Sequence, residues 1–467
     1  MRALMNPRRS ILSIVFLFSG LVLLVLLYTS CPALAANSIL KSHIIAYNLR
    51  ALEKSLVNGT YRGEEGILRI RPEIAESMGM KVIIDQDYLD SMRLFKEAKN
   101  ALREAKTAMA SREKERFSGY YDQRIADHFL LFRRSTEEAK SKLIQYRSRI
   151  DPDIDERLNK NVCASLIDRI LDKSFKENNN RLRDGLAYFY NMCQGVNEKD
   201  FPLTPENVSF VNHVFNKFLE QAPEKEIEMF DLDRDSGYKK EQLSYNWKDL
   251  AGIEMSRFSA LLEAALHRFD DKIYQVDPLL FISLMKKESA FDHLAISSVG
   301  AAGLTQIMPR TAKDMGMNDI LLPGYFIEAE SLIKSERENR RQAMTALFQI
   351  REENGLKYAK KARKLMQTSL GLGQKRERLF ARYRKELLEK GVDERLQPAK
   401  AIEYGLKYFA KLLKDQNGDI SLALASYNAG PHRVREYKGI PPYAETVDFR
   451  NRVLQYYWDY LSRAKVD

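Results

Sequence analysis

The chain has 467 residues, of which 30% are charged, and it carries a formal net charge of +11. This length allows two or three domains with sizeable cores, and the charged fraction excludes a protein that lies mainly within a membrane. Three cysteines without CxxC spacing and six dispersed histidines without an HxxxH pair exclude the common zinc motifs, so we expect no metal and no cofactor. The basic excess suits an anionic polymer or a membrane surface.

Residues 1–35 have the pattern of a secretory signal. Three arginines precede the uncharged run 11–28, and an Ala-x-Ala site ends at Ala35. We expect cleavage after Ala35, which leaves a net charge of +8 because positions 1–35 hold three arginines and no acidic residue. A retained membrane anchor is the first alternative, since the run is nearly long enough to span a bilayer. Lipidation at Cys31 is the second, although Tyr28 stands where a lipobox usually has Leu. Export argues against nucleic acid as a partner.

Residues 36–247 form a region of unknown role that we expect to be helical. A short strand is predicted at 81–85, and the charged, glycine-poor stretch 86–150 predicts long helices, as a hairpin or a coiled coil. These helices fit a solvated spacer better than a partner-binding surface. A second helical bundle is predicted at 155–222, and no internal repeat is evident.

Two features of this region have more than one interpretation. Cys163 and Cys193 could form one disulfide in an oxidising compartment or remain as two buried thiols. The segment 231–237 invites comparison with a calcium loop, but its glycine comes one place late and Gln242 stands where the loop needs Glu. A polar linker turn is therefore the better interpretation.

Residues 248–467 predict a compact helical domain that is interrupted by a charged insertion at 323–397. The insertion holds 18 Lys and Arg residues against 11 Asp and Glu residues, so it carries nearly all of the remaining positive charge. Its helical texture fits an inserted hairpin with a solvated face. A basic flap that holds an anionic polymer is the alternative.

Glu288 is the candidate catalytic residue. Asp277 can cap a helix with Pro278 in its first turn, and residues three and four apart share a helix face. Glu288 therefore lies on the same apolar face as Leu284 and Met285. Burial disfavours the charged carboxylate, which raises the pKa and leaves a proton to donate near neutral pH. Taken alone, a Glu here is better explained by an ion pair with a neighbouring lysine or by a helix end without chemistry.

Polar residues at glycine-marked turns favour the catalytic interpretation. Gln306 lies in a tight segment that follows Gly303, and its amide can both donate and accept hydrogen bonds. Tyr427 and Asn428 end a short apolar helix that stops at a glycine. A tyrosine offers a ring on which a sugar can stack and a hydroxyl near developing charge. Glu445 opens the last helix.

These segments together resemble a known catalytic domain. The ordered motifs are Asp277-Pro278, Glu288-Ser289, Gly303-Leu-Thr-Gln306-Ile-Met-Pro309, Tyr427-Asn-Ala-Gly430 and Glu445-Thr446. They are similar to the motifs of the soluble lytic transglycosylases, which are bacterial murein-cleaving enzymes with a lysozyme-like fold close to goose-type lysozyme. The resemblance covers about 248–322 and 398–465, roughly 30% of the chain. It implies a mostly α fold, in which a lysozyme-like C-terminal domain with a helical insertion follows a helical N-terminal region.

The resemblance also implies a mechanism. Glu288 would be the sole acid and base, which protonates the oxygen between N-acetylmuramic acid and N-acetylglucosamine. The C6 hydroxyl would then close a 1,6-anhydro ring without consuming water. The residues that would hold the substrate or support the site are Ser289, Gln306, Tyr427, Asn428 and Glu445.

By the same resemblance, the substrate would be the glycan strands of peptidoglycan, and the protein would lie in the bacterial periplasm or cell envelope. Membrane attachment through the N-terminus and an envelope protein bound to the N-terminal helices are open options. Two alternatives to a lyase stay open. A hydrolase of the same fold would pass the sugar to water, with Asp292 as the only candidate second carboxylate near Glu288 in sequence. A non-catalytic murein-binding scaffold of the envelope would only grip the glycan.

Three departures from the family pattern bear on the details. Thr305 stands where Met is commoner, which is a tolerated variant. Phe449 stands where a Tyr usually follows the Glu-Thr pair, and this removes one hydroxyl. The insertion 323–397 is far longer than the usual connection, which affects the shape of the substrate groove and the preference for chain ends.

Overall fold

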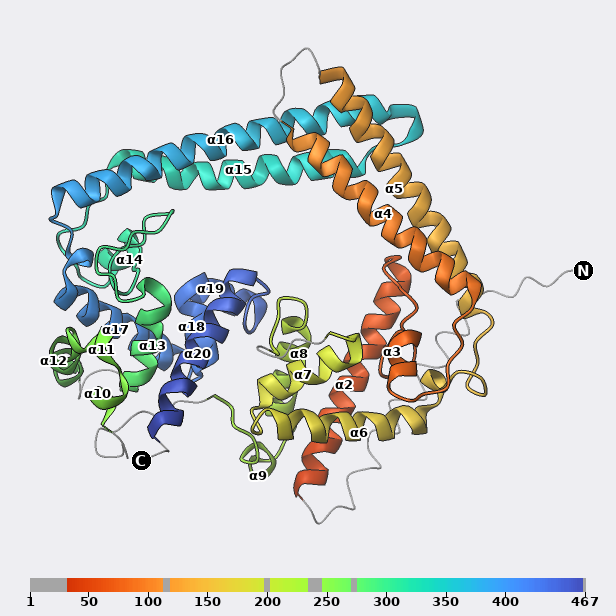
Figure 1. Ribbon diagram of the computed structural model, residues 1–467, viewed down its shortest axis with the longest axis horizontal. Coiled ribbons are helices and arrows are strands. Elements are labelled where there is room, and N and C mark those ends of the chain that lie inside the picture. Colours follow the sequence, from red (N-terminus) through yellow and green to blue (C-terminus); the bar gives the residue numbers. More distant parts are fainter. Residues whose placement is uncertain (1–31, 112–117, 197–201, 234–245, 270–274, 465–467) are drawn as a thin grey trace, which may run out of the picture.

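The computed structural model describes residues 32–111, 118–196, 202–233, 246–269 and 275–464 (Figure 1). These residues are mostly helical, and within them β pairing is confined to isolated bridges. The prediction of a mostly α-helical chain is therefore confirmed. Within the described ranges, no helix combines the length and the apolar character that a membrane crossing needs.

The N-terminal half gathers its helices around one core. Its elements are α2 (Pro32–Val57), α3 (Pro72–Ser77), α4 (Gln86–Ala110), α5 (Ser118–Arg147), η2 (Glu156–Leu158), α6 (Lys160–Glu177), α7 (Leu182–Gln194), α8 (Val208–Gln221) and α9 (Glu224–Ile227). Buried apolar residues of α2, α6, α7 and α8 form the core, among them Leu40, Ile167, Leu186 and Val211. The long helices α4 and α5 extend from this core as a hairpin (Figure 1).

The C-terminal half has a similar plan. Its elements are α10 (Trp247–Leu250), α11 (Ile253–Ser256), α12 (Ser259–Phe269), α13 (Pro278–Ser289), α14 (Pro309–Asp314), α15 (Gly324–Phe348), η4 (Glu352–Asn354), α16 (Gly355–Lys390), η5 (Glu394–Leu396), α17 (Pro398–Asp415), α18 (Ile420–Ala429), α19 (Pro431–Tyr437) and α20 (Ala444–Ala464). Helix α13 lies in the core, because eight of its successive residues from Pro278 to Met285 are buried. The helices α12, α17, α18 and α20 cover it with their apolar faces.

The predicted insertion is a helical hairpin made of α15 and α16, and one face of its far end is buried against other helices. Figure 1 shows it meeting the tip of the α4–α5 hairpin. Small and apolar residues of all four helices share one core there, including Ala105, Ile125, Ala343 and Ala362. Small residues allow the helix backbones to approach closely. The α4–α5 hairpin, expected as a solvated spacer, is therefore bound at its tip to the insertion.

Polar bonds also join the two hairpins. Gln367 on α16 donates its amide to the carbonyl of Met109 at 3.1 Å, and Arg133 on α5 donates to the carbonyl of Ile350 at 3.1 Å. The ring of Phe348 packs edge-on against that of Phe129, with centroids 5.3 Å apart. The hairpins thus form a specific contact rather than a loose crossing.

Several local expectations have an outcome in the structure. The strand predicted at 81–85 is wrong: the segment is irregular, because its backbone groups bind side chains rather than a neighbouring strand. The amide of Lys81 donates to the Glu156 carboxylate at 2.6 Å, and the Ile83 carbonyl accepts from the hydroxyl of Tyr146 at 3.0 Å. Cys163 and Cys193 are free, buried thiols.

Two other expectations fall partly outside the described residues. The signal prediction lies there up to residue 31, and 32–35 open α2. Most of the calcium-loop segment lies there too. The described part places Asp233 in an ion pair of 2.8 Å with Arg450, which occupies the carboxylate that a calcium loop would use.

Candidate active site

Helix α13 carries Glu288 in its last turn, and its first turn is fixed at the other end. The carboxylate of Asp277 accepts from the amide of Leu279 at 2.8 Å, with Pro278 in the first helical position, so the predicted cap is confirmed. The hydroxyl of Tyr457 on α20 donates to the other carboxylate oxygen at 2.9 Å. This double contact sets the position of α13 relative to α20.

The carboxyl group of Glu288 favours its protonated form. The side chain is only partly exposed, and removal from water raises its pKa to about 8. The charge of Glu445 raises the pKa further, and that of Lys287 lowers it. The ammonium of Lys287, however, lies 2.6 Å from Asp448, and Lys286 lies over an aromatic ring. Within the described part of the chain, no hydrogen bond engages the carboxyl of Glu288, so the lysine-pair explanation of this residue does not hold.

Ser289 and Gln306 stabilise the turn that faces the end of α13. The buried hydroxyl of Ser289 donates to the carbonyl of Leu304 at 2.9 Å. Gln306 has a left-handed backbone with φ of 47°, and its amide nitrogen donates to the carbonyls of Ala295 and Gly303 at 2.9 and 2.8 Å. These donors are used within the protein, so the carbonyl oxygen of Gln306 is the group that is left for a ligand.

Tyr427 connects this turn to α18. Its hydroxyl donates to the carbonyl of Thr305 at 2.7 Å, and its ring lies parallel to that of Phe449 with centroids 6.4 Å apart. Burial raises the pKa of Tyr427 well above its ordinary value, and the neighbouring Glu288 raises it further. Tyr427 therefore lies close to Glu288 and stays protonated.

Asn428 and Glu445 complete the group of predicted residues. The hydroxyl of Thr446 donates to the side-chain oxygen of Asn428 at 2.7 Å, which orients the amide so that its nitrogen is the group left for a ligand. Glu445 is exposed in the first turn of α20 and close enough to raise the pKa of Glu288. Asp292 accepts from the amide of Leu294 at 2.9 Å and caps its own turn.

The motifs predicted from sequence therefore meet around the end of α13. A comparison with family models matches residues 266–325 and 329–447 to the transglycosylase SLT domain. Residues 266–447 therefore contain a lytic transglycosylase domain of the SLT type. Its substrate is peptidoglycan.

Solved structures of lytic transglycosylases also match this chain, but with low sequence identity and low TM-scores. The 70-kDa soluble lytic transglycosylase of Escherichia coli is 14% identical, with a TM-score of 0.29 over 99% of this chain and 76% of that chain. An inactive variant of the lytic transglycosylase Slt of Pseudomonas aeruginosa is 13% identical, with a TM-score of 0.28 over 97% of this chain and 75% of that chain. A 70-kDa soluble lytic transglycosylase in complex with bulgecin A also matches, at 14% identity and a TM-score of 0.29 over 99% of this chain and 76% of that chain. The domain assignment rests on the family model.

Sequence reasoning did not identify Arg395, a buried residue that binds the backbone of the turn at 300–307. Arg395 lies near the end of the insertion, in η5, and is 1% exposed. Its guanidinium donates to the carbonyls of Gly300 and Ile307 at 2.9 and 3.1 Å, to the hydroxyl of Tyr383 at 2.6 Å, and to the carboxylate of Asp393. A charged residue in a charged segment carries no sequence signal of burial, so only the structure reveals this role.

Proposed function

We propose that Glu288 is the sole general acid and general base of this lytic transglycosylase, and that the cleaved bond is the β-1,4 link from N-acetylmuramic acid to N-acetylglucosamine. The observation that carries the proposal is a partly exposed carboxyl group with a pKa of about 8 and no internal hydrogen bond in the described part of the chain. Such a group holds a proton at neutral pH and can give it to a substrate oxygen.

The first step transfers the proton of Glu288 to the glycosidic oxygen, and the bond from that oxygen to C1 breaks. The acetamido carbonyl of the same sugar attacks C1 and shares the positive charge that develops there. Glu288 is then a carboxylate close to Glu445, and two negative charges near one another favour the return of a proton.

The second step returns Glu288 to its starting state. The C6 hydroxyl gives its proton to the Glu288 carboxylate, and the C6 oxygen attacks C1 while the acetamido carbonyl leaves. The product has a 1,6-anhydro ring, and no water is consumed. Proton transfer from one placed group supplies about 10²–10⁴ in rate, and binding must supply the rest.

The remaining residues position this chemistry. Tyr427 and Ser289 bind the carbonyls of Thr305 and Leu304, so they hold the turn that bears Gln306 against the end of α13. We assign substrate contacts to the side-chain carbonyl oxygen of Gln306 and the side-chain amide nitrogen of Asn428. Glu445 supports the site through its charge.

A single acid distinguishes this reaction from hydrolysis with two carboxylates. Asp292, the alternative second carboxylate, caps its own turn and does not contribute to the raised pKa of Glu288. Mass spectrometry of the released muropeptides separates the two reactions. Anhydro ends are lighter by one water than reducing ends, and reducing ends as the main product would refute the proposed second step.

Substitution tests the role of Glu288 itself. We expect Glu288→Gln to lose at least about 10²-fold in the rate of sacculus digestion, because the amide cannot donate an acidic proton. Asp292→Asn is the matched control and should keep wild-type activity. Undiminished digestion by Glu288→Gln would refute the assignment, and binding without any soluble product from the wild type would favour the scaffold alternative.

We also propose that the enzyme is exported and acts in the periplasm or cell envelope, with peptidoglycan strands as its partner. Cleavage after Ala35 would place the new terminus at Ala36, whose side chain is buried. N-terminal sequencing of the protein from the cell envelope tests this site. A chain that retains residues 1–35 would favour membrane attachment.

A further inference from the structure

Two segments of the chain follow one pattern, 237 positions apart. Residues 63–80 and 300–317 both have Gly-x-x-Gly, then an apolar residue, a variable residue, a polar residue, Ile, a variable residue and Pro; Met-Gly-Met ends both. The φ angles of the two glycines and the polar residue are 87°, 71° and 53° in the first segment, and 92°, 79° and 47° in the second. The second segment is the turn that bears Gln306.

Each turn is held by a buried arginine of a second matching segment. Residues 155–158 and 393–396 both read Asp-Glu-Arg-Leu. Arg157 donates to the carbonyls of Gly63 and Ile70 at 2.7 and 3.2 Å, to the hydroxyl of Tyr146, and to the carboxylate two residues before it. These are the counterparts of all the bonds described for Arg395.

Close packing at the glycines is also the same. A Cβ atom at Gly66 would lie 1.8 Å from the carbonyl oxygen of Arg157, and one at Gly303 would lie 1.8 Å from the carbonyl oxygen of Arg395. A side chain is excluded at both positions, because such a contact would force the backbone apart. Positive φ angles could occur in any glycine turn. The close approach of both glycines to the carbonyl oxygen of the matching arginine, however, requires the same surrounding fold.

The helices around the turns correspond as well. The side-chain amide of Asn207, which directly precedes α8, donates to the side-chain oxygen of Asn191 on α7 at 2.9 Å. On α18 and α20, the matching bond joins Thr446 to Asn428. Tyr190 precedes Asn191 as Tyr427 precedes Asn428, and it packs on Phe210 with ring centroids 5.2 Å apart. The hairpins α4–α5 and α15–α16 occupy the same place in each order of elements.

The contacts between the halves are reciprocal. Asn212 on α8 donates to the carbonyl of Ile440 at 2.8 Å, and Asn451 on α20 donates to the carbonyl of Leu203 at 2.8 Å. Asn212 and Asn451 occupy matching positions of their helices. Reciprocal contacts of this kind are the mark of a two-fold, isologous interface.

We propose that residues 32–222 are a second copy of the catalytic unit, which has lost its acid and binds a peptidoglycan glycan strand without cutting it. This inference rests on the proposed function for the type of ligand. It revises the expectation that the chain has no internal repeat and gives a role to the N-terminal region.

The acid is missing at the corresponding position. Asn48 on α2 donates to the carbonyl of Ile67 at 3.1 Å, which is the bond that Ser289 makes to the corresponding carbonyl in the catalytic half. The residue before Asn48 is Tyr47, so a phenol takes the place of the Glu288 carboxyl. Burial raises the pKa of Tyr47, and neighbouring Tyr190 raises it further, so this phenol stays protonated.

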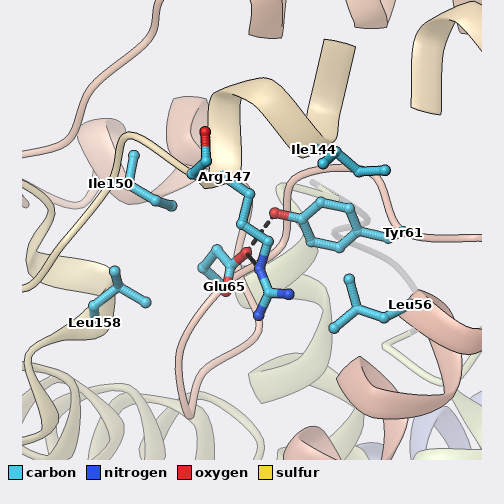
Figure 2. A pocket seen from close by; sticks show the side chains of 8 residues that line it. Leu56, Tyr61, Glu65, Ile144, Arg147, Ile150 and Leu158 are labelled. Carbon is cyan, nitrogen blue, oxygen red and sulfur yellow. Dashed lines mark hydrogen bonds and ion pairs between the residues drawn. The ribbon is translucent and has the colours of Figure 1, made fainter. Parts of the chain in front are cut away.

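The carboxylate of Glu65, in the N-terminal turn, does not replace the lost acid. Figure 2 shows the carboxylate of Glu65 beside Tyr61 and Arg147, with dashed lines that join it to both. The hydroxyl of Tyr61 donates to Glu65, and the guanidinium of Arg147 lies 2.7 Å from the same oxygen. Glu65 is 2% exposed, and one of its carboxylate oxygens accepts from both Tyr61 and Arg147, so its role is within the protein.

The N-terminal half has a group of aromatic side chains that suits the binding of a sugar. Tyr47 and Tyr190 are partly exposed, and within the described residues neither hydroxyl has a hydrogen-bond partner. Tyr47 also lies beside Phe210 and His213, with ring centroids 5.2 and 5.3 Å away. Aromatic faces with polar tips suit amino sugars, whose rings stack while their hydroxyl and acetamido groups form hydrogen bonds.

Titration of the full chain with a tetrasaccharide of alternating N-acetylglucosamine and N-acetylmuramic acid tests the proposal. The Glu288→Gln background prevents cleavage, and we expect two binding events per chain. Tyr190→Ala should weaken one event at least about tenfold, and Tyr427→Ala should weaken the other. Tyr188→Ala, on the same helix α7, is the matched control and should leave both binding events unchanged. A single binding event in the background protein would overturn the proposal.

Two further measurements keep the outcomes distinct. The N-terminal variants in the wild-type background should cut a short soluble glycan at the normal rate, which shows that they fold. If Tyr190→Ala is misfolded, Glu206→Gln, an exposed change at the position that matches Glu445, replaces it. Two unchanged binding events in the folded variants would refute the second site. Continued cleavage by Glu288→Gln would instead refute the proposed function, without changing the number of bound strands.

Discussion

Replacing Glu288 by Gln should stabilise the protein, and the gain should grow with pH. The pKa of Glu288 is about 8 in the folded protein, against an ordinary value of 4.5 that holds in the unfolded chain. Below pH 4.5 the group is protonated in both states, so folding carries no ionisation penalty. As the pH rises, the unfolded chain ionises first, and the folded state loses stability until the pH passes about 8.

The size of the effect follows from the two pKa values. Keeping the proton on Glu288 costs about 2 kcal/mol at pH 6, and the penalty levels off at about 5 kcal/mol above pH 8. The partial exposure of the side chain makes these values upper estimates, because nearby water stabilises the charge. The Gln side chain has no such penalty, and any other effect of the substitution on packing does not depend on pH.

Urea unfolding at pH 4.5, 6 and 8.5, followed by circular dichroism, measures the difference between wild type and Glu288→Gln. The apparent free-energy difference should rise across this series. Glu53→Gln, at an exposed position of α2, is the control and should give a flat difference. A flat difference for Glu288→Gln as well would show that the carboxyl group is not held in its protonated form by burial, and the reasoning about the active site would fail.

Further predictions concern four other properties. The kcat/KM on a soluble glycan should fall on the alkaline side near pH 8, as Glu288 loses its proton, and a rate that still rises through pH 9 would contradict its role as the acid. Arg395→Met should lower the free energy of unfolding by about 3–5 kcal/mol, because it leaves a buried carboxylate unpaired, and a loss in urea unfolding below 1 kcal/mol would contradict this. Phe129→Ala should cost about 3–5 kcal/mol and speed hydrogen exchange at both hairpin tips, and faster exchange in α5 alone would argue against the shared core. The thiols of Cys163 and Cys193 should react with a thiol reagent only in denaturant, because burial raises the pKa of Cys163 to about 12.

The helical frame and the place of Glu288 on an apolar helix were predictable because they depend on local patterns. Asp277 and Pro278 mark the start of α13, and the spacing of Leu284, Met285 and Glu288 places the carboxyl on an apolar face. These rules act within one or two turns of helix. They say nothing about which distant groups will surround the side chain.

The prediction of a strand at 81–85 was wrong. It rested on a short apolar run alone, and no neighbouring strand pairs with this segment in the described residues. The hydroxyl of Tyr146 and the carboxylate of Glu156, both more than 60 positions away, satisfy the backbone of this segment. Gln306 is a similar case, since its donors bind backbone carbonyls rather than facing outward. Sequence spacing cannot show such long-range satisfaction of polar groups.

The repeat escaped sequence reasoning for a different reason. Its shared residues are those that set backbone geometry, such as Gly66 and Arg157, whereas the residues that carry chemistry have changed. Tyr47 stands for Glu288, and Arg69 stands for Gln306. A search for conserved chemistry therefore passes over a conserved fold.

The position of Tyr383 has a practical consequence for anyone who wishes to shorten this protein. The residue lies within the final turns of α16, yet its hydroxyl binds both Arg395 and the carbonyl of Leu321 at 2.9 Å. Excising α15 and α16 entirely would remove this anchor and leave the buried guanidinium of Arg395 without its partner Tyr383. A trimmed version should instead retain the last three turns of α16, which include Tyr383, and the first turn of α15, and join them with a short linker.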